Sequence, residues 1–481
     1  MISVSISRTR ARRLSVIGAL ALTALTATTA HARQAARWAP FLGEWSGVAA
    51  RRPDAGLPVS VRLTVRPAGD SVRVSIGLPE SRQVDLAVPS PYSDSANMSL
   101  ADGVLRAELT PDIGYAFIGD LGVPRAEERI ILAVRRQGDA LTGELRITTY
   151  RSPVTLVRAE PPPREPSIAF HSAGDSLRLG GMLVLPEGRG PFPAIVWVTG
   201  SDADTRLAWS YEARVLAAKG VASLLYDKRG VGESAGASHD LASWDDLAGD
   251  VEGALAYLRS RPDLIDTTRL GLAGQSQGTW IIAKVAARDH GVRFLVSMAG
   301  SGIGAAEQET YRTGALMRRA GFPEAEIARA QDFQRRKFAV ARTGLGWPAL
   351  DSAMQRLRAD SVAWFPGYGT GAGARTLASL RMYGVLQFNY EPTRDLARIK
   401  APVLVLMGER DVVFPPAIVV ERMRAALARA GNRDLTARIF PGPSHGLMAR
   451  QSADGRLFRG AISEEFLSII TEWIVNRVAR R

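Results

Sequence analysis

Residues 270–281 limit the possible folds of this chain more than any other segment. Their sequence is Leu-Gly-Leu-Ala-Gly-Gln-Ser-Gln-Gly-Thr-Trp-Ile, so an apolar, strand-like run leads into Gly274 and an apolar, helix-like run leaves Gly278. A strand that bends sharply into a helix needs very small residues two positions before and two positions after the bend. The segment therefore predicts a strand–turn–helix bend at Ser276. At such a bend the serine hydroxyl is lifted clear of the sheet and can act as a nucleophile.

A second Gly-x-Ser-x-Gly pattern occurs at residues 232–236, around Ser234. It follows a loop-like run, and no apolar helix comes directly after it. His239 and Asp240 are close to Ser234 in sequence, but such near neighbours cannot easily converge their side chains on one carbonyl group. We therefore interpret Ser234 as a loop residue and Ser276 as the nucleophile.

The base that would activate Ser276 can be sought among the few histidines of the chain, since a serine hydroxyl is a weak nucleophile at neutral pH. Of the five histidines, His445 directly follows a strand-like run, residues 435–440. A loop after the last strand can present an imidazole beside Ser276, so we predict that His445 is the base. The other histidines lie in the N-terminal leader, near the linker, in the loop around Ser234 and at a helix end: His31, His171, His239 and His290.

A carboxylate must orient the histidine, and in this arrangement it should lie between the serine and the histidine in the chain. Asp411 follows the apolar run 403–407 and so sits just past the end of a predicted strand. Glu409 is the alternative, because it is a carboxylate in the same turn. The order serine, aspartate, histidine favours Asp411.

Two N–H donors are needed to stabilise the oxyanion of a tetrahedral intermediate. The backbone N–H of Gln277, directly after the nucleophile, is the first candidate. The second is the backbone N–H of Ser201, in the loop Thr-Gly-Ser-Asp that follows the predicted strand 194–198. The alternative is that residues 199–202 form an ordinary connection between a strand and a helix.

Charged residues follow the predicted strand 221–226, namely Asp227, Arg229 and Gly230 of the run Asp-Lys-Arg-Gly. A carboxylate and a guanidinium so close together could contact a substrate. An arginine that binds a carboxylate through both arms of its guanidinium is also an effective structural clamp. We therefore expect these residues to brace loops beside the site.

Residues 167–481 predict a doubly wound α/β domain with a mostly parallel sheet, because strand-like apolar runs alternate with helical patterns. Between about residues 304 and 400 only helical patterns are found. This stretch lies between two predicted sheet strands. We expect it to form a helical cap over the carboxyl ends of the strands, where ligands bind in open α/β sheets.

Residues 36–158 predict a separate all-β domain, since short runs of alternating polar and apolar residues are separated by turn signals. Such a pattern is typical of an antiparallel barrel or sandwich. The segment 41–47 resembles the opening of lipocalin-like barrels, and we expect Trp45 to fill the core. Residues 159–166 are rich in proline and are predicted to be a stiff linker that no strand or helix would contain.

The first 32 residues have the pattern of a secretory signal peptide. Four arginines precede an apolar run from Leu14 to about Thr28, and Ala30-His-Ala32 fits a cleavage site. This predicts export to the periplasm or the medium after cleavage near Ala32, with no membrane span in the mature chain. The pair Arg12-Arg13 leaves the Sec and twin-arginine export routes both open.

The charge and the absence of cysteine exclude several classes of function. The formal net charge is +13, or +9 without the four leader arginines, and it is scattered rather than gathered in blocks. We therefore predict no nucleic-acid partner. A chain without cysteine has no disulfides, thiolate metal sites or cysteine nucleophile. We expect neither a metal nor a cofactor, and oligomeric state cannot be inferred.

Together these segments resemble the α/β-hydrolase fold family over about residues 165–481. The resemblance rests on Gly-Gln-Ser276-Gln-Gly, Gly-Glu-Arg-Asp411 and Ser-His445-Gly. The segment 226–234 is similar to that of exported esterases and acyl hydrolases related to the prolyl oligopeptidase and dienelactone hydrolase branches. Two positions depart from the pattern: Thr199 stands where many relatives have a histidine before the oxyanion glycine, and Thr279 replaces a glycine.

The resemblance and the residues together predict an exported serine hydrolase that cleaves carboxylic esters of small molecules through an acyl-enzyme. Ser276 would attack, His445 would carry the proton and Asp411 would orient His445. One alternative is a peptidase or amidase of the prolyl oligopeptidase type with the same residues. Another is a protein that binds acyl compounds without turnover, because fold does not dictate function.

Overall fold

The computed structural model describes most of the chain after residue 36. The described residues are 37–49, 59–68, 71–78, 83–88, 97–109, 130–147, 150–159, 164–365, 367, 376–386, 388–447, 449–451, 457–459 and 462–479. The predicted signal peptide, residues 1–32, lies outside them. Among the described helices, none has both the length and the apolar character that crossing a membrane requires.

The chain divides into two compact units, with the main boundary between residues 161 and 162. The end of the predicted linker is hydrogen-bonded to residues 183–185. The carbonyl groups of Arg164 and Pro166 accept hydrogen bonds from the N–H groups of Leu185 and Leu183, at 2.9 and 3.1 Å. Proline lacks an N–H group but keeps its carbonyl, so it can still pair with the edge of a strand. Arg164 forms only an isolated bridge to Leu185, and none of the described strands or helices contains a residue of the predicted linker.

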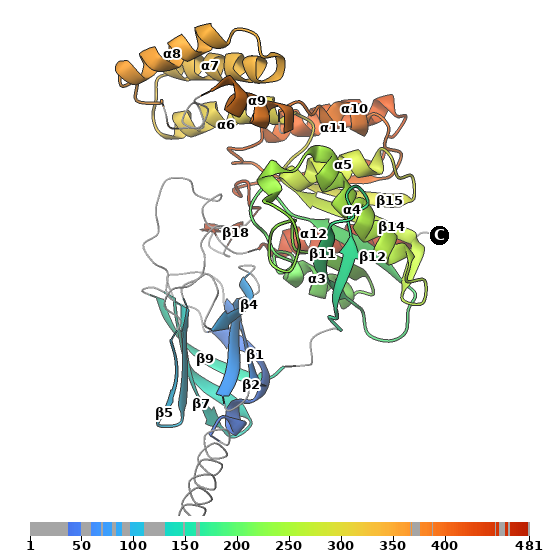
Figure 1. Cartoon of the computed structure of the whole chain (residues 1–481). Coiled ribbons are helices and arrows are strands. Elements are labelled where there is room, and N and C mark those ends of the chain that lie inside the picture. Colours follow the sequence, from blue (N-terminus) through green and yellow to red (C-terminus); the bar gives the residue numbers. More distant parts are fainter. Residues whose placement is uncertain are drawn as a thin grey trace, which may run out of the picture. The chain divides into compact units, whose positions relative to one another are not determined.

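The first unit is built from strands, of which nine lie in the described residues (Figure 1). They are β1 (Gly43–Ala49), β2 (Val59–Ala68), β3 (Ser71–Leu78), β4 (Gln83–Val88), β5 (Asn97–Ala101), β6 (Val104–Leu109), β7 (Ile130–Gln137), β8 (Ala140–Ile147) and β9 (Tyr150–Arg158). Their order in the sheet is β4-β3-β2-β1-β9-β8-β7-β6-β5. The first and last strands, β1 and β9, pair antiparallel, as they do in an up-and-down barrel.

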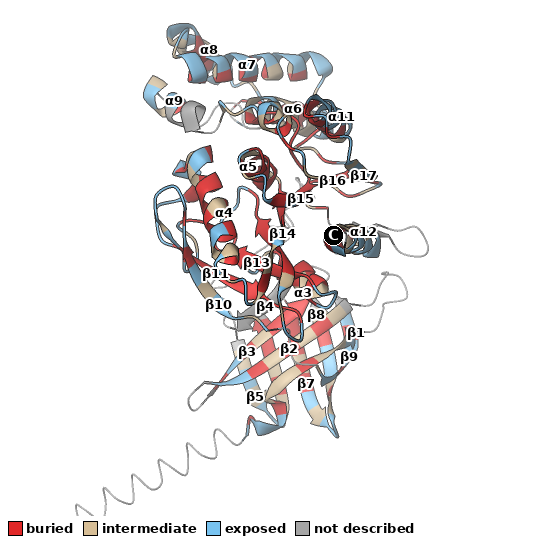
Figure 2. Ribbon diagram, turned by 90° about the vertical axis from the view of Figure 1, so that its right-hand side faces the viewer, coloured by how far each residue is buried: buried red, intermediate tan, exposed pale blue. Residues whose placement is uncertain are grey.

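This β unit has an apolar core of its own. Val61, Leu63 and Val65 on β2 are buried, whereas the residues between them are partly exposed, which is the period-two pattern of a sheet with one covered face (Figure 2). Trp45 on β1 is completely buried, and its indole N–H donates to the carbonyl of Phe41 at 2.7 Å. The prediction that Trp45 fills the core is confirmed.

The second unit contains a sheet of eight described strands. They are β10 (Ser167–His171), β11 (Arg178–Val184), β12 (Phe192–Val198), β13 (Ala222–Tyr226), β14 (Ile265–Gln275), β15 (Val292–Met298), β16 (Val403–Gly408) and β17 (Leu435–Phe440), in the order β10-β11-β13-β12-β14-β15-β16-β17. The strands from β13 to β17 in this order run parallel, and β10 and β11 run antiparallel at one edge. The predicted mostly parallel sheet is confirmed, although β10 was not anticipated as a strand.

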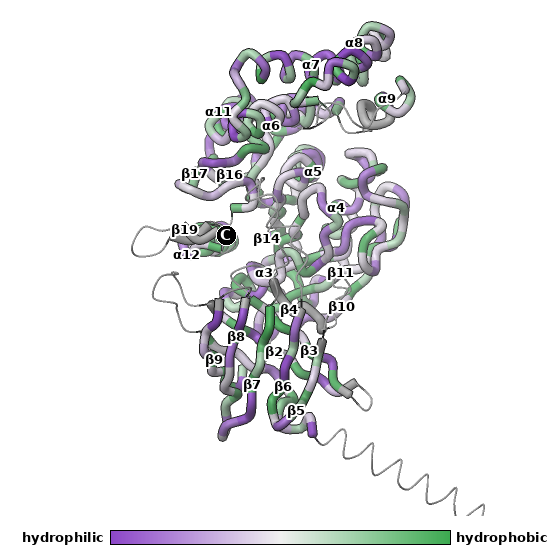
Figure 3. The backbone as a smooth tube through the Cα atoms, turned by 90° about the vertical axis from the view of Figure 1, so that its left-hand side faces the viewer, coloured by the Kyte–Doolittle hydropathy of each residue, from purple (hydrophilic) through white to green (hydrophobic). Residues whose placement is uncertain are grey.

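Helices cover both faces of this sheet. On one face pack α4 (Trp244–Arg259), α5 (Gln277–Ala286) and α11 (Pro416–Arg429), and on the other pack α3 (Ser210–Ala217) and α12 (Glu464–Ala479). Each face has its own core of buried apolar side chains. In Figure 3, green hydrophobic segments lie around the central strand β14. The sheet is therefore doubly wound, as the alternation of strands and helices predicted.

Five helices lie between β15 and β16 among the residues that the structure describes there. They are α6 (Ala305–Arg319), α7 (Glu324–Thr343), α8 (Trp347–Ala359), α9 (Leu377–Leu386) and α10 (Pro392–Leu396). The first four enclose a separate apolar core that includes Met317, Phe333 and Trp364. Figures 1 and 2 show α6–α9 as a layer on the side of α5 and α11. A short antiparallel pair, β18 (Ala449–Gln451) and β19 (Leu457–Arg459), precedes α12.

Candidate active site

Ser276 occupies the bend between β14 and α5 with a left-handed backbone, φ +52° and ψ −116°. This conformation is strained for a residue with a side chain, and such strain clusters at functional sites. The two flanking glycines are needed because the bend is crowded. A Cβ atom on Gly274 would lie 2.5 Å from the carbonyl oxygen of Gly278. The predicted strand–turn–helix bend is therefore present, and it holds Ser276 partly exposed.

The hydroxyl of Ser276 meets the imidazole of His445, which comes from the loop after β17. The distance between Ser276 Oγ and His445 Nε2 is 2.9 Å. The other ring nitrogen, Nδ1, lies 3.0 Å from Oδ2 of Asp411. His445 and Asp411 are each 2% exposed. Three side chains that are far apart in sequence thus form one hydrogen-bonded series, with only the serine end open to solvent.

Asp411 is held in place by the turn in which it lies. Its Oδ1 atom accepts hydrogen bonds from the backbone N–H groups of Val413 and Phe414, at 2.7 and 2.9 Å. These bonds leave Oδ2 for His445, whose ring stacks on Phe414 with 5.8 Å between centroids. Tyr311 of α6 donates its hydroxyl to the carbonyl of Asp411 at 2.9 Å. The inserted helices therefore contact the turn that carries this acid.

Glu409, the alternative acid, is turned elsewhere. Its carboxylate accepts a hydrogen bond from the backbone N–H of Gly442 at 3.2 Å, and the residue is exposed. The structure brings Asp411, and not Glu409, to His445.

The loop after β12 runs beside Ser276. A Cβ atom on Gly200 would lie 3.4 Å from the Cβ atom of Ser276 and 2.7 Å from Oε1 of Gln275, so a side chain there would require the Gln275 side chain to move. Gln277 is the first residue of α5, where backbone N–H groups have no partner within the helix. In the described part of the chain, no acceptor is found for the backbone N–H of Ser201. Both predicted oxyanion donors thus belong to segments next to the serine.

Lys228 is a residue of this region that the sequence reasoning missed. It is 4% exposed, and its ammonium group donates to the carbonyl of Gly200 and, at 3.0 Å, to the side-chain oxygen of Gln277. Burial lowers the pKa of Lys228 to about 8. One signal was available: the chain has five lysines among 61 basic residues, so a lysine beside Arg229 is unusual here.

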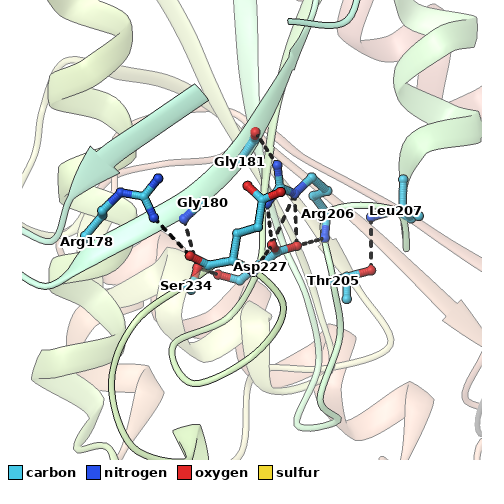
Figure 4. A network of polar contacts seen from close by, with 9 residues as sticks. Arg178, Gly180, Gly181, Thr205, Arg206, Leu207, Asp227 and Ser234 are labelled. Carbon is cyan, nitrogen blue, oxygen red and sulfur yellow. Dashed lines mark hydrogen bonds and ion pairs between the residues drawn. The ribbon is translucent and has the colours of Figure 1, made fainter. Parts of the chain in front are cut away.

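Ser234 lies in a loop, as predicted, and its hydroxyl both donates and accepts a hydrogen bond with backbone groups (Figure 4). It donates to the carbonyl of Asp227 at 2.6 Å and accepts from the N–H of Gly180 at 3.0 Å. The imidazole of His239 is directed at a different residue: its Nε2 atom is 2.9 Å from the carbonyl oxygen of Ser201. The sequential neighbours Ser234, His239 and Asp240 therefore form no catalytic series.

Asp227 and Arg229 brace loops, as expected. Asp227 binds the guanidinium of Arg206 through both carboxylate oxygens, at 2.6 to 3.1 Å (Figure 4). Arg229 binds both oxygens of Asp250 on α4, at 2.9 and 2.6 Å. Burial raises the pKa of Asp250, while its bonds to Arg229 lower it. These paired charges fix the loop that carries Lys228.

Thr279 has a clear structural role. Its hydroxyl donates to the carbonyl of Ser276 at 2.6 Å, and it is 1% exposed. The replacement of a glycine at this position thus adds a bond that supports the bend. Thr199 is also buried. No group of three or more potential metal ligands occurs among the described residues.

Comparison with known proteins places this arrangement in context. The sequence model of the family described as "Alpha/beta hydrolase family" matches residues 195–457, which is 263 of the 481 residues. A thiohydrolase of Aspergillus aculeatus, aneE, is 32% identical over 124 residues, which are 26% of this chain and 38% of that protein. The chain therefore aligns with well under two thirds of this relative.

Two solved structures are similar to part of this chain. An esterase from Pyrococcus furiosus is 13% identical, with a TM-score of 0.41, and the match covers 66% of this chain and 91% of that one. A proline iminopeptidase from Mycobacterium smegmatis is 20% identical, with a TM-score of 0.40, and the match covers 65% and 99%. Since the family model spans more than half of the chain, the protein belongs to the alpha/beta hydrolase family.

Proposed function

We propose that this protein is a serine hydrolase that cleaves carboxylic esters through an acyl-enzyme. The observation that carries the proposal is the series from Ser276 Oγ to His445 Nε2, 2.9 Å, and from His445 Nδ1 to Asp411 Oδ2, 3.0 Å. An imidazole at hydrogen-bond distance from a serine can act as its general base, and a buried carboxylate on the other ring nitrogen stabilises the imidazolium that forms.

The proposed reaction has two halves. Ser276 Oγ forms a bond to the ester carbonyl carbon while its proton moves to His445 Nε2, and the oxyanion is held by the N–H groups of Gln277 and Ser201. The carbon–oxygen bond to the leaving alcohol then breaks, and His445 gives the proton to that alcohol. Water repeats the sequence: it loses a proton to His445, attacks the acyl carbon and releases the acid, and the proton returns to Ser276.

The substrate class can be narrowed by comparing leaving groups. An amide nitrogen must be protonated as it leaves, so a peptidase of the prolyl oligopeptidase type makes a stronger demand on His445 than an esterase does. The similarity to a thiohydrolase adds thioesters as a second class to test. We propose that esters are the preferred substrates. The test is an assay of an ester, a thioester and an anilide that share one acyl group.

The surroundings of the site complete the proposal. We propose that α6–α9 act as a cap that shapes the acyl pocket, since Tyr311 of α6 bonds to the turn of Asp411. We also propose that the chain is exported to the periplasm or the medium after removal of residues 1–32, and that residues 36–158 and 167–481 are separate domains. The substrate would be a small ester or acyl compound, and no nucleic acid is involved.

Labelling with a fluorophosphonate, followed by mapping of the modified peptide, tests the proposed nucleophile. We expect the label on Ser276 and its loss in Ser276→Ala and His445→Ala. Ser234→Ala is the matched control and should still be labelled. Label on Ser234, or turnover that survives in Ser276→Ala, would overturn the proposal. Binding of acyl compounds with no turnover in the unmodified protein would favour the non-catalytic alternative.

A further inference from the structure

The buried ammonium group of Lys228 has no part in the reaction described above, yet it lies directly behind the loop that should hold the oxyanion. Its Nζ atom donates to the carbonyl of Gly200 and, at 3.0 Å, to Oε1 of Gln277. Lysine is rarely buried, because removing its charge from water is costly unless partners compensate. A lysine buried here at 4% exposure therefore needs an explanation.

The carbonyl that Lys228 binds belongs to the same peptide group as the N–H of Ser201. The peptide bond between Gly200 and Ser201 is trans, so its C=O and N–H point in opposite directions within one plane. A cation fixed on the oxygen side thus sets the direction of the N–H on the other side. It also draws electron density toward the oxygen, which makes the N–H a stronger donor, as in hydrogen-bond chains that polarise one another.

Two further contacts involve the segments that carry the proposed oxyanion donors. The second acceptor of Lys228 is the side chain of Gln277, whose backbone N–H is the other proposed oxyanion donor. His239 lies with Nε2 2.9 Å from the carbonyl oxygen of Ser201, which is the next peptide group along the loop. Lys228 therefore joins the two segments that carry the two donors, and His239 limits the rotation of the peptide that follows.

We propose that Lys228 is a positioning residue that aligns and polarises the Gly200–Ser201 peptide group, and so sets the strength of the oxyanion hole. This inference rests on the proposed function, because it assigns Lys228 a role in the ester hydrolysis of Ser276. Lys228 does not touch the substrate. It acts through the N–H of Ser201 and through the side chain of Gln277.

The charge of Lys228 gives the proposal a pH dependence. Burial lowers its pKa to about 8, and four aspartates that face it counteract this effect: Asp202, Asp204, Asp240 and Asp250. His239 also faces it, and burial and the Lys228 charge both lower the pKa of His239. Below its pKa Lys228 is charged and polarises the peptide group. As the pH rises through about 8 the charge is lost, so kcat should fall on the alkaline side.

The test is kcat and KM for an activated nitrophenyl ester from about pH 6 to about pH 10, with spontaneous hydrolysis subtracted. Removing a direct oxyanion donor costs roughly 10²–10³-fold in kcat, so we expect about tenfold for Lys228→Met, with KM nearly unchanged. The alkaline fall of the unmodified protein should be absent in this variant. Lys228→Arg keeps the charge at all these pH values, so it should restore most of kcat and also lack the alkaline fall.

The matched control is Lys400→Met, which removes another lysine bond to a backbone carbonyl, that of Ala430, away from the site. It should keep both kcat and the alkaline fall. The inference is overturned if Lys228→Met keeps the kcat of the unmodified protein or keeps its alkaline fall. Should Lys228→Met not fold, an unmodified protein without an alkaline fall near pH 8 would overturn it equally.

The two proposals fail in different ways. If the unmodified protein neither hydrolyses esters nor takes the fluorophosphonate on Ser276, the proposed function is wrong. If it does both and Lys228→Met is unaffected, only the role of Lys228 is wrong.

Discussion

Two segments of the molecule share the pattern Gly-x-Ser-x-Gly, and they solve the same steric problem in opposite ways. In residues 274–278 the serine itself carries the left-handed backbone, with φ +52° at Ser276. In residues 232–236 the two glycines carry it, with φ +55° and +103°, and Ser234 has an ordinary backbone. The strain is thus placed on the serine only where a strand turns directly into a helix.

The hydrogen bonds of the two hydroxyl groups differ in the same sense. Ser234 donates to the backbone carbonyl of Asp227 and accepts from the N–H of Gly180, so its hydroxyl connects β11 to the loop that follows β13. Ser276 faces the imidazole of His445, a group that can accept a proton. The comparison teaches that the five-residue pattern has no chemistry of its own. The hydrogen-bond partner of the hydroxyl decides whether the serine has a structural role or can act as a nucleophile.

The largest effect should come from removing the hydroxyl of Ser276. Ser276→Ala is expected to lower kcat for ester hydrolysis by roughly 10⁶-fold, because the covalent route is lost while binding remains. Steady-state kinetics with a nitrophenyl ester measure this, and thermal unfolding checks that the fold is intact. The comparison of the two serines breaks down if Ser276→Ala retains more than a small fraction of the activity.

The next largest effect should come from Asp411→Asn, which keeps the shape of the side chain but removes its charge. A charged Oδ2 accepts a hydrogen bond from His445 Nδ1, which leaves Nε2 free to accept the proton of Ser276. The uncharged amide no longer favours this form of the ring. We expect a loss of about 10⁴-fold in kcat. Glu409→Gln is the matched control, since Glu409 bonds to Gly442 instead, and it should change kcat by less than about threefold. A larger loss in Glu409→Gln than in Asp411→Asn would reverse the assignment of the acid.

A smaller effect should come from crowding the bend at Ser276. In Gly274→Ala the new Cβ atom would meet the carbonyl of Gly278 at 2.5 Å, so the backbone must shift. We expect the free energy of unfolding to fall by about 1–3 kcal/mol and kcat by about tenfold. Chemical denaturation and kinetics measure the two effects. Gly174→Ala is the control, because a Cβ atom there meets nothing within 4 Å, and equal losses in both variants would contradict this account.

The sequence was informative where local pattern determines structure. Apolar runs such as residues 194–198 became buried parallel strands, because a central strand has both faces covered. The strand β10 was missed, since Ser167–His171 is mostly exposed at the edge and its apolar run, Ile168-Ala-Phe170, is short. Ser276, Asp411 and His445 could be named because each follows a strand, and the ends of parallel strands meet at one edge of the sheet.

Lys228 could not be found in the same way. In the sequence it is one member of a charged run, Asp-Lys-Arg, and such a run is typical of a solvated surface. Its burial depends on the loop of Gly200 and on the start of α5, which come from two other parts of the chain. The polarity of a residue predicts its exposure only when no distant segment supplies partners for it.

The smallest effect on activity should come from Ser234→Ala, and this variant sharpens the comparison most directly. Removing the Ser234 hydroxyl leaves the buried N–H of Gly180 without its acceptor, so the free energy of unfolding should fall by about 1–2 kcal/mol. The same change should alter kcat by less than about twofold, since Ser234 Oγ bonds only to the backbone in the described residues. Ser352→Ala, which removes an exposed serine bond to a helix carbonyl, controls for the loss of any hydroxyl and should change stability by less than about 0.5 kcal/mol. Two serines that share glycines two positions before and after would then differ in effect, Ser234 on stability and Ser276 on the reaction rate. A large loss of kcat in a stable Ser234→Ala would instead show that the loop around Ser234 also serves the reaction.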